Sequence, residues 1–306
     1  MQAKANTQTR DGVLLAIAAT LLWSGNFIIA RKASESIGPV SLAFYRWSCA
    51  TIVLFPFALN KIKAESTAMK LNWKILLLLS FTGIALFNTF VYVAGHHTTA
   101  INMALIGTTS SPIFATAMAA FFLKERMGFF RIIGMLICIA GIILLISKGS
   151  WDVLKHFKFS IGDAWILAGS FAFAVYNILV RKKPSGISPL SFLWILFCLG
   201  TFMLLPFYLM EQHFTNYQTN WSYGLLGSIL YLGIGTSVLA FWSWNLAIAK
   251  LGAGRTVLFG NLIPVFSTLE AVFLLGEKMT MIHLSSGILV IAGLIIANIT
   301  LQKNKQ

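Results

Sequence analysis

The chain has few charged residues. Asp, Glu, Lys and Arg together make up 10% of its 306 residues, whereas hydrophobic residues make up 58%. Soluble domains carry about 25% charged residues. So few charges cannot cover the water-facing surface of a chain of this length. The shortage therefore excludes an ordinary soluble domain and indicates an all-α membrane protein that crosses the bilayer many times.

Cysteine is scarce as well, and the residue patterns of common active sites are missing. The three cysteines, Cys49, Cys138 and Cys198, lie in apolar runs without the spacing of metal ligands. The sequence has no nucleophile elbow GxSxG, no P-loop GxxxxGK[ST] and no paired His/Cys set. We therefore expect no catalytic residue, no metal, no cofactor and no built-in ATPase.

The net charge of +14 does not form one basic patch. The Lys and Arg residues fall in short clusters between apolar runs, as they do beside membrane helices. We therefore expect the lipid bilayer as a partner and no nucleic acid.

Ten apolar segments are long enough to cross a bilayer, at about 20 residues or ~30 Å of helix each. They fall near residues 12–30, 40–59, 73–95, 100–123, 128–147, 161–180, 189–210, 222–248, 255–275 and 281–301. With the N-terminus in the cytoplasm, the outside segments hold only Arg31, Lys32, Lys148, Lys155, Lys158 and Lys278 of the 23 basic residues. Arg46 lies within a span, and the other 16 fall in inside segments. This bias predicts that both termini are cytoplasmic.

The two halves of the chain resemble each other. "LFPFAL" at 54–59 matches "LLPFYL" at 204–209, and "SPIFATAMAAFFLKER" at 111–126 matches "IPVFSTLEAVFLLGEK" at 263–278. Each copy would hold five spans, an odd number, so the second copy would cross the membrane upside down relative to the first. Inverted repeats are typical of transporters, with the binding site near the midplane between the halves.

Several motifs are similar to those of a known family. They are "LLWSGNFIIARK" at 21–32, "PVSLAFYRW" at 39–47, "HHTTAINMALIGTTSSPIFATAMAAFFLKER" at 96–126 and "SWNLAIAKLGAGRTVLFGNLIPVFSTLEAVFLLGEK" at 243–278. With them the chain resembles the EamA family of the drug/metabolite transporter superfamily.

The resemblance implies ten transmembrane helices arranged as two inverted five-helix EamA repeats. Helices 1–5 would occupy residues 12–148 and helices 6–10 residues 160–301. It implies a secondary transporter of the bacterial inner membrane that exports small metabolites by alternating access. Amino acids, their derivatives and drug-like solutes are the implied substrate classes, and spans 1, 3, 4, 6, 8 and 9 would line the cavity.

Polar and aromatic side chains within these spans are candidates for the substrate cavity. An asparagine in hydrocarbon needs a partner, so it faces protein or a watery cavity. A tryptophan ring can stack on a flat or cationic ligand. The candidates are Trp23, Asn26, Asn88, Tyr92, Tyr176, Asn177, Trp244, Asn245 and Asn261. Contacts between helices, repair of the backbone near a proline and anchoring at the membrane interface are the alternative roles.

Two prolines and two histidines also stand out. Pro112 and Pro264 occupy equivalent places in the repeats, where a proline would kink a helix. We expect a helix kink at both, serving either packing or a hinge. His96 and His97 adjoin a short external turn, where we expect them to be solvated rather than to sense pH.

Arg46 and Glu270 are charges inside spans. Each lies about seven residues from the outer end of its span, so both lie at a depth of roughly 10 Å. Met118 and Leu196 stand opposite them in the other repeat, so a symmetric scaffold does not need them. A role in gating or coupling is therefore favoured.

Three explanations are open for these charges. Glu270 could carry a coupling proton while Arg46 reaches toward the interface. The two could form an ion pair that closes the outer gate, or Glu270 could bind a solute cation. We favour the ion pair, because it satisfies both charges in one contact.

Two other classes of protein compete with a transporter of a small-molecule solute. An intramembrane enzyme acting on lipid or isoprenoid would need clustered Asp, Glu and His in several spans, and this chain has one deep carboxylate. A receptor or structural protein has no need of an inverted repeat. The sequence leaves the substrate, the direction of transport, proton coupling and the oligomeric state open.

Overall fold

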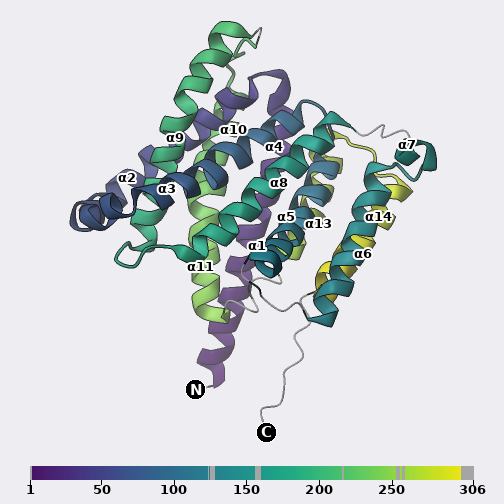
Figure 1. Ribbon diagram of the computed structural model, residues 1–306, viewed down its shortest axis with the longest axis horizontal. Helices are drawn as coiled ribbons and strands as arrows, with labels where there is room; N and C mark the ends of the chain where they lie inside the picture. The colour runs from purple at the N-terminus through teal and green to yellow at the C-terminus, as the bar shows by residue number, and fades with distance from the viewer. Residues whose placement is uncertain are drawn as a thin grey trace.

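The computed structural model describes residues 2–122, 124, 128–155, 160–215, 217–252, 256 and 259–297, and every regular element in these residues is a helix (Figure 1). Parts of the expected repeats, including residues 123, 125–127 and 298–301, lie outside this description. The elements are α1 (Gln2–Lys32), η1 (Ala33–Glu35), α2 (Pro39–Leu71), α3 (Trp73–Ser80), η2 (Phe81–Leu86), α4 (Phe87–Gly95), α5 (Ala100–Phe122), α6 (Phe129–Ile146), α7 (Trp151–Lys155), α8 (Ile161–Leu179), η3 (Val180–Lys182), α9 (Pro189–Phe214), α10 (Tyr223–Leu230), η4 (Tyr231–Leu239), α11 (Ala240–Leu251), η5 (Gly260–Leu262), α13 (Ile263–Leu275) and α14 (Met281–Ala297).

In the described residues, seven helical stretches are long and apolar enough to cross a membrane. They are Thr9–Glu35, Pro39–Leu71, Trp73–Gly95, Phe129–Ile146, Ile161–Lys182, Pro189–Phe214 and Tyr223–Leu251. Two shorter apolar helices cover Gly260–Leu275 and Met281–Ala297, and α5 contributes 23 residues more. The chain is therefore a multi-pass helical membrane protein. The apolar segments expected from the sequence coincide with these helices, while ten crossings stay a prediction.

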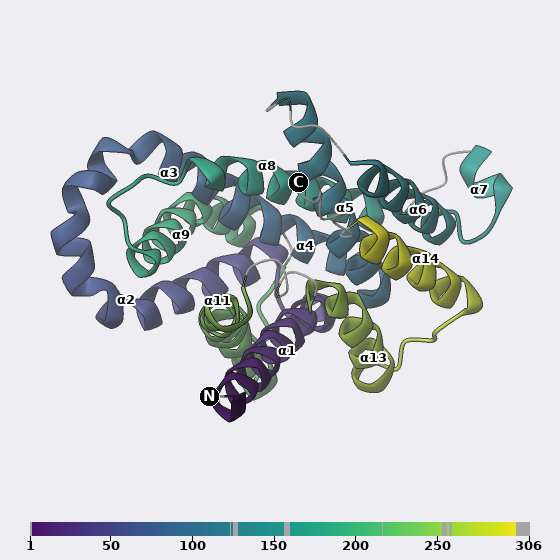
Figure 2. The same ribbon diagram turned by 90° about the horizontal axis from the view of Figure 1, so that it is seen from below.

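Helix α2 is longer than the sequence indicated. Its span was expected to end near residue 59, but the helix continues to Leu71 and curves away from the bundle (Figure 2). The extension, "NKIKAESTAMKL", contains three Lys and two Ala, which favour helix even where no apolar core selects it. Hydropathy shows where the apolar segment ends, but the helix itself continues beyond that point.

Helices from the two halves pack in a reciprocal pattern. α2 pairs with α9, α5 with α13, and α6 with α14, and the members of each pair occupy the same place in their halves. α1 packs against α11 and α13, while α8, its counterpart, packs against α4 and α5. Figure 2 shows α6 and α14 side by side. Exchanging the two halves therefore maps the first three pairs onto themselves and the contacts of α1 onto those of α8.

Glycines permit the close contact between α6 and α14. A Cβ on Gly134 would fall on the carbonyl oxygen of Gly293, and a Cβ on Gly293 would lie 2.6 Å from Cys138 Sγ. Small residues let membrane helices approach backbone to backbone. Neither glycine can therefore gain a side chain without moving the two helices apart.

Glutamates from one half cap helices of the other half. Glu211 at the end of α9 accepts hydrogen bonds from the backbone N–H groups of Val40 (2.9 Å) and Ser41 (2.7 Å) at the start of α2. Glu65 near the end of α2 accepts one from the N–H of Ser188 before α9 (3.0 Å). Carboxylates satisfy the free N–H groups of a helix N-terminus and complement its dipole. These caps therefore tie α2 and α9 together at both ends.

Buried carboxylates are more numerous than the sequence suggested. The structure buries Asp163 (2% exposed) and Glu211 (6% exposed), whereas Glu270 is half-buried. Asp163 accepts a hydrogen bond from Thr98 Oγ1 at 2.9 Å. Both lie near helix ends, where donors surround them, so neither resembles a charge placed in mid-membrane. Each has a structural partner that the linear sequence does not reveal.

The two equivalent prolines differ in position. Pro112 lies inside α5, and a kink of this helix at Pro112 stays a prediction. Pro264 is the second residue of α13, which directly follows the 3-10 turn η5, so the helical stretch Gly260–Leu275 changes from 3-10 to α-helix just before this proline, and the kink stays a prediction. A proline in the first helical turn removes an N–H group that has no partner in any case. Pro264 therefore costs α13 no hydrogen bond within its own first turn.

Candidate functional site

Arg46 is the centre of a buried group of polar side chains, which we call the Arg46 cluster. The residue lies in α2 and is 4% exposed. Its Nη1 shares its two hydrogens among three acceptors, Asn26 Oδ1 (2.7 Å), Asn88 Oδ1 (2.6 Å) and Tyr92 Oη (2.7 Å), and its Nε donates to Ser237 Oγ (3.0 Å). The partners come from α1, α4 and η4, so both halves of the chain hold the same guanidinium.

Local helix geometry explains how two of these partners meet. Asn88 and Tyr92 are four residues apart in α4, which places them on one face of that helix. Ser237 lies in η4, a π-helical segment, where its Oγ donates to the carbonyl of Leu232 five residues earlier (2.8 Å). That leaves the oxygen free to accept from Arg46. π-helical turns occur frequently at functional sites.

The partners of Arg46 in the described residues are all neutral. The Trp47 ring adds a cation–π contact, with its centroid 4.6 Å from the guanidinium carbon. The Nη2 atom of Arg46 makes no hydrogen bond to a described residue. Charged side chains at membrane depth are costly and mark solute or ion pathways. The cluster therefore holds a positive charge and keeps a spare donor.

Glu270 lies on a different side of α1. Its Oε1 is 2.7 Å from Ser24 Oγ, while its Oε2 is buried without a hydrogen-bond partner in the described residues. Ser24 and Asn26 are two residues apart, so they point about 200° apart around the helix and lie ~3 Å apart along it. Arg46 and Glu270 thus lie at one level but on different sides of α1. The ion pair that the sequence favoured is not formed among the described residues.

The tryptophans expected in spans 1 and 8 contact each other. Trp23 packs on Trp244, with ring centroids 5.1 Å apart, and its Nε1 donates to the carbonyl of Thr236 at 3.1 Å. Asn245 is exposed, and its amide donates to the carbonyl of Phe241 in its own helix (2.8 Å). The structure therefore brings Trp23 and Trp244 together, and Asn245 satisfies its own backbone.

Three further candidates have no bond to the Arg46 cluster. The Tyr176 ring packs directly against Gly83 of η2 and stacks on Phe173, with centroids 5.6 Å apart. Asn177 and Asn261 are half-buried, and neither side chain has a hydrogen bond in the part of the chain that the structure describes. Asn261 therefore does not repair the backbone near Pro264, and its role stays a prediction.

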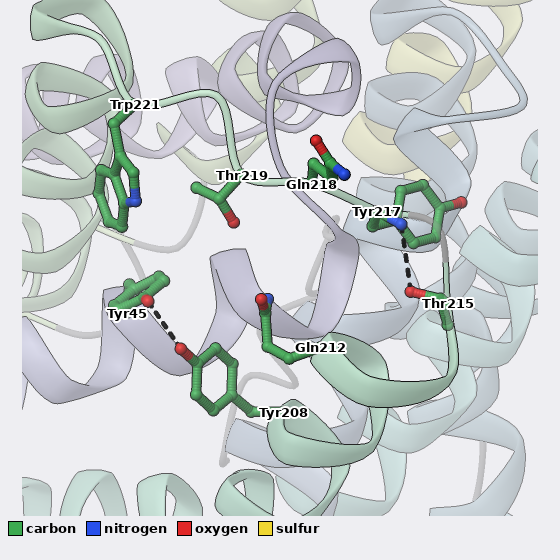
Figure 3. A pocket seen from close by; sticks show the side chains of 8 residues that line it. All are labelled: Tyr45, Tyr208, Gln212, Thr215, Tyr217, Gln218, Thr219 and Trp221. Atoms are coloured by element: carbon green, nitrogen blue, oxygen red, sulfur yellow. Dashed lines mark hydrogen bonds between the residues drawn. The ribbon is translucent and has the colours of Figure 1, made fainter.

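A cavity lies beyond α9, away from the expected residues. It has a volume of about 670 Å³ and is lined by Tyr45, Tyr208, Gln212, Thr215, Tyr217, Gln218, Thr219 and Trp221. Figure 3 shows the hydroxyls of Tyr45 and Tyr208 pointing toward each other, 2.8 Å apart, with Trp221 above Tyr45. None of the lining residues is charged. Sequence reasoning missed this cavity, because five of its eight lining residues belong to the connection after α9.

His96 is not the solvated turn residue that the sequence suggested. It is half-buried, and its ring packs against Tyr217, with centroids 5.2 Å apart. Burial, together with the neighbouring His97 and Arg31, lowers the pKa of His96 to about 4. His96 is therefore neutral at physiological pH, while His97 is exposed.

Comparison with known proteins now decides the family. Residues 10–147 and 160–299 match the model of the EamA-like transporter family. The chain belongs to the EamA-like transporter family. It is a transporter and not an enzyme, as the sequence led us to expect.

Relatives of this EamA-like chain match it over nearly its whole length. A protein of Archaeoglobus fulgidus named an uncharacterized transporter is 28% identical over 285 residues, which cover 93% of this chain and 96% of that protein. A probable amino-acid metabolite efflux pump of Salmonella typhimurium is 25% identical over 293 residues, 94% of each chain. A crystal structure with 20% identity superimposes with a TM-score of 0.62, over 94% of this chain and 96% of that chain. The last likeness supports the fold alone.

Proposed function

We propose that this EamA-like protein is a secondary transporter that exports small metabolites, namely amino acids or their derivatives, across the bacterial inner membrane. The efflux pump of Salmonella typhimurium, similar over 94% of this chain, supports the solute class and the direction. The proposal includes alternating access, in which two halves expose one central site first to one side and then to the other.

The proposed architecture is ten spans in two inverted repeats with both termini in the cytoplasm. The reciprocal pairings, in which α1 with α11 and α13 corresponds to α8 with α4 and α5, support an exchange symmetry between the halves. The accumulation of Lys and Arg in the segments assigned to the cytoplasm supports the orientation.

The Arg46 cluster is the observation that carries the proposal. It holds a buried guanidinium through three residues of the first half and through Ser237 of the second. When the halves part, Ser237 would leave Arg46, and the guanidinium would face the opening between them. A site that the two halves share and that their separation uncovers is what alternating access requires.

Efflux from proteoliposomes tests this function. Vesicles that contain the purified protein are loaded in turn with radiolabelled L-amino acids and their N-acetyl derivatives, and protein-dependent loss of each solute is timed. Asn88→Ala removes a hydrogen bond to a charge, about 1.5–3 kcal/mol, so the rate should fall about ten- to hundredfold.

The matched control is Asn60→Ala, because Asn60 is exposed and lies in the same helix as Arg46. It should transport at the wild-type rate. The proposed function is wrong if no member of the panel leaves wild-type vesicles faster than protein-free ones. The role of the Arg46 cluster is wrong if Asn88→Ala and Asn60→Ala behave alike.

A further inference from the structure

Ser24 makes two short contacts with a single hydrogen. Its Oγ lies 2.7 Å from the carbonyl oxygen of Leu21 and 2.7 Å from Glu270 Oε1. A hydroxyl donates one hydrogen, and a carbonyl oxygen only accepts. With an ionised Glu270, one of these contacts would press two oxygens together without a hydrogen between them. A proton on Glu270 Oε1 removes the conflict, because the acid then donates to Ser24 and Ser24 donates to Leu21.

The other oxygen of Glu270 gives an independent indication. Oε2 is buried and has no hydrogen-bond partner in the described residues. An ionised carboxylate out of water needs donors or a cation around it, whereas the carbonyl oxygen of a neutral acid tolerates isolation far better. The surroundings of Glu270 thus suit an acid and do not suit a carboxylate.

Elements packed against α13 supply no compensating cation among the described residues. α13 packs against α1, α5 and η5. Neither α5 nor η5 contains a titratable residue, and the charged residues of α1 lie near its ends. Tyr231 of η4 faces Glu270, but its hydroxyl donates to the carbonyl of Leu22 at 2.9 Å. Arg46 lies on another side of α1, bonded to Asn26.

We infer that Glu270 is the proton-binding site of this transporter and that the structure holds it in its protonated form. The inference rests on the proposed function. A proton from the aqueous phase on one side converts the carboxylate to the acid, and release on the other side regenerates the carboxylate.

Helix α1 connects this proton site to the Arg46 cluster. When Glu270 loses its proton, the hydrogen of Ser24 must turn from Leu21 to the carboxylate to keep the contact. That change occurs two residues before Asn26, which holds Arg46. Protonation therefore acts on the helix that carries part of the solute site, which is the link that coupled transport needs.

Infrared difference spectroscopy tests the proton site without any solute. The purified protein in lipid is compared at about pH 6 and about pH 9, a range in which exposed carboxyl groups stay ionised. The wild type should show the carbonyl stretch of a protonated carboxylic acid, and Glu270→Gln should lose it. Glu35→Gln, which changes an exposed glutamate, should keep the band. Ser24→Ala should keep it at a shifted frequency, because the acid loses its acceptor.

The inference is overturned if the wild type has no such band, or if Glu270→Gln leaves the band unchanged. If Glu270→Gln does not fold, the presence of the band in the wild type and its shifted frequency in Ser24→Ala still test whether Glu270 is protonated. The liposomes described above then test coupling with an enclosed pH-sensitive dye. Efflux of the transported solute should move protons in the wild type and should become independent of the pH gradient in Glu270→Gln.

The two proposals fail in distinguishable ways. If no solute of the panel is transported, the proposed function is wrong, and the infrared band alone decides the proton site. If solute leaves the vesicles without proton movement, the function stands and proton coupling through Glu270 is rejected.

Discussion

Replacing Tyr92 by Phe removes one oxygen from the Arg46 cluster and leaves the ring in place. Tyr92 is 1% exposed, its Oη accepts from Arg46 Nη1 at 2.7 Å, and its hydroxyl donates to Asn26 Oδ1 at 3.3 Å. A hydrogen bond to a charged group is worth about 1.5–3 kcal/mol, and the longer neutral bond adds less. Because Nη1 still donates hydrogen bonds to Asn26 and Asn88, the guanidinium keeps hydrogen-bond partners in this variant. We therefore expect Tyr92→Phe to cost about 2 kcal/mol of stability.

The assay is reversible unfolding in mixed detergent micelles, read as a free energy of unfolding. Tyr176→Phe is the matched control, because the Tyr176 hydroxyl has no hydrogen bond among the described residues. It should change stability by no more than about 0.5 kcal/mol. Combining Tyr92→Phe with Asn88→Ala should give a non-additive loss, because both side chains bind the same Nη1. If the two Tyr→Phe variants lose equal stability, the assignment of Tyr92 to a charge-bearing cluster is refuted.

Three further predictions follow from the topology, the α6–α14 contact and the buried histidine. Single cysteines at the exposed residues Thr67 and Thr215, in a cysteine-free background, should be labelled from opposite sides of the membrane; labelling from one side would reject the orientation. Gly134→Ala should destabilise the protein by about 1–3 kcal/mol through overpacking, whereas Gly227→Ala, whose Cβ would meet nothing within 4 Å, should be neutral or stabilising; equal effects would contradict the close contact. Because the pKa of His96 in the folded protein, about 4, lies below its unfolded value near 6.5, thermal stability should fall as pH drops through this window, and His96→Phe should reduce that fall.

The helices could be predicted largely from hydropathy, because a span has to be apolar over its whole length. The π-helical segments could not. η2 and η4 read "FTGIAL" and "YLGIGTSVL", and both are as apolar as the spans that contain them. A signal was present in the repeat itself: Gly83 and Gly233 are 150 residues apart, the same offset that relates "LFPFAL" at 54–59 to "LLPFYL" at 204–209. Each glycine accommodates a side chain of another helix, Tyr176 against Gly83 and Cys49 against Gly233.

Part of the Arg46 cluster could also be expected from the sequence. The spacing of Asn88 and Tyr92 places them on one face, and an asparagine within a span needs a polar partner. Ser237 carried no such signal, because a serine in a membrane helix commonly bonds its own backbone. Only the π turn, which directs that bond to Leu232, leaves the Ser237 oxygen available to Arg46.

The preferred ion pair fails for a geometric reason. Distance along the sequence from a helix end fixes the depth of a residue, and the equal depths of Arg46 and Glu270 agree with their partners Asn26 and Ser24 on one turn of α1. A contact also requires the two side chains to point to the same side, and the rotation of each helix is set by packing that one sequence does not contain. Because α1 lies between them, Arg46 and Glu270 do not neutralise each other and instead contact two different sides of α1. This separation is what the two proposals require, a solute at Arg46 and a proton at Glu270, whereas a closed ion pair would occupy both.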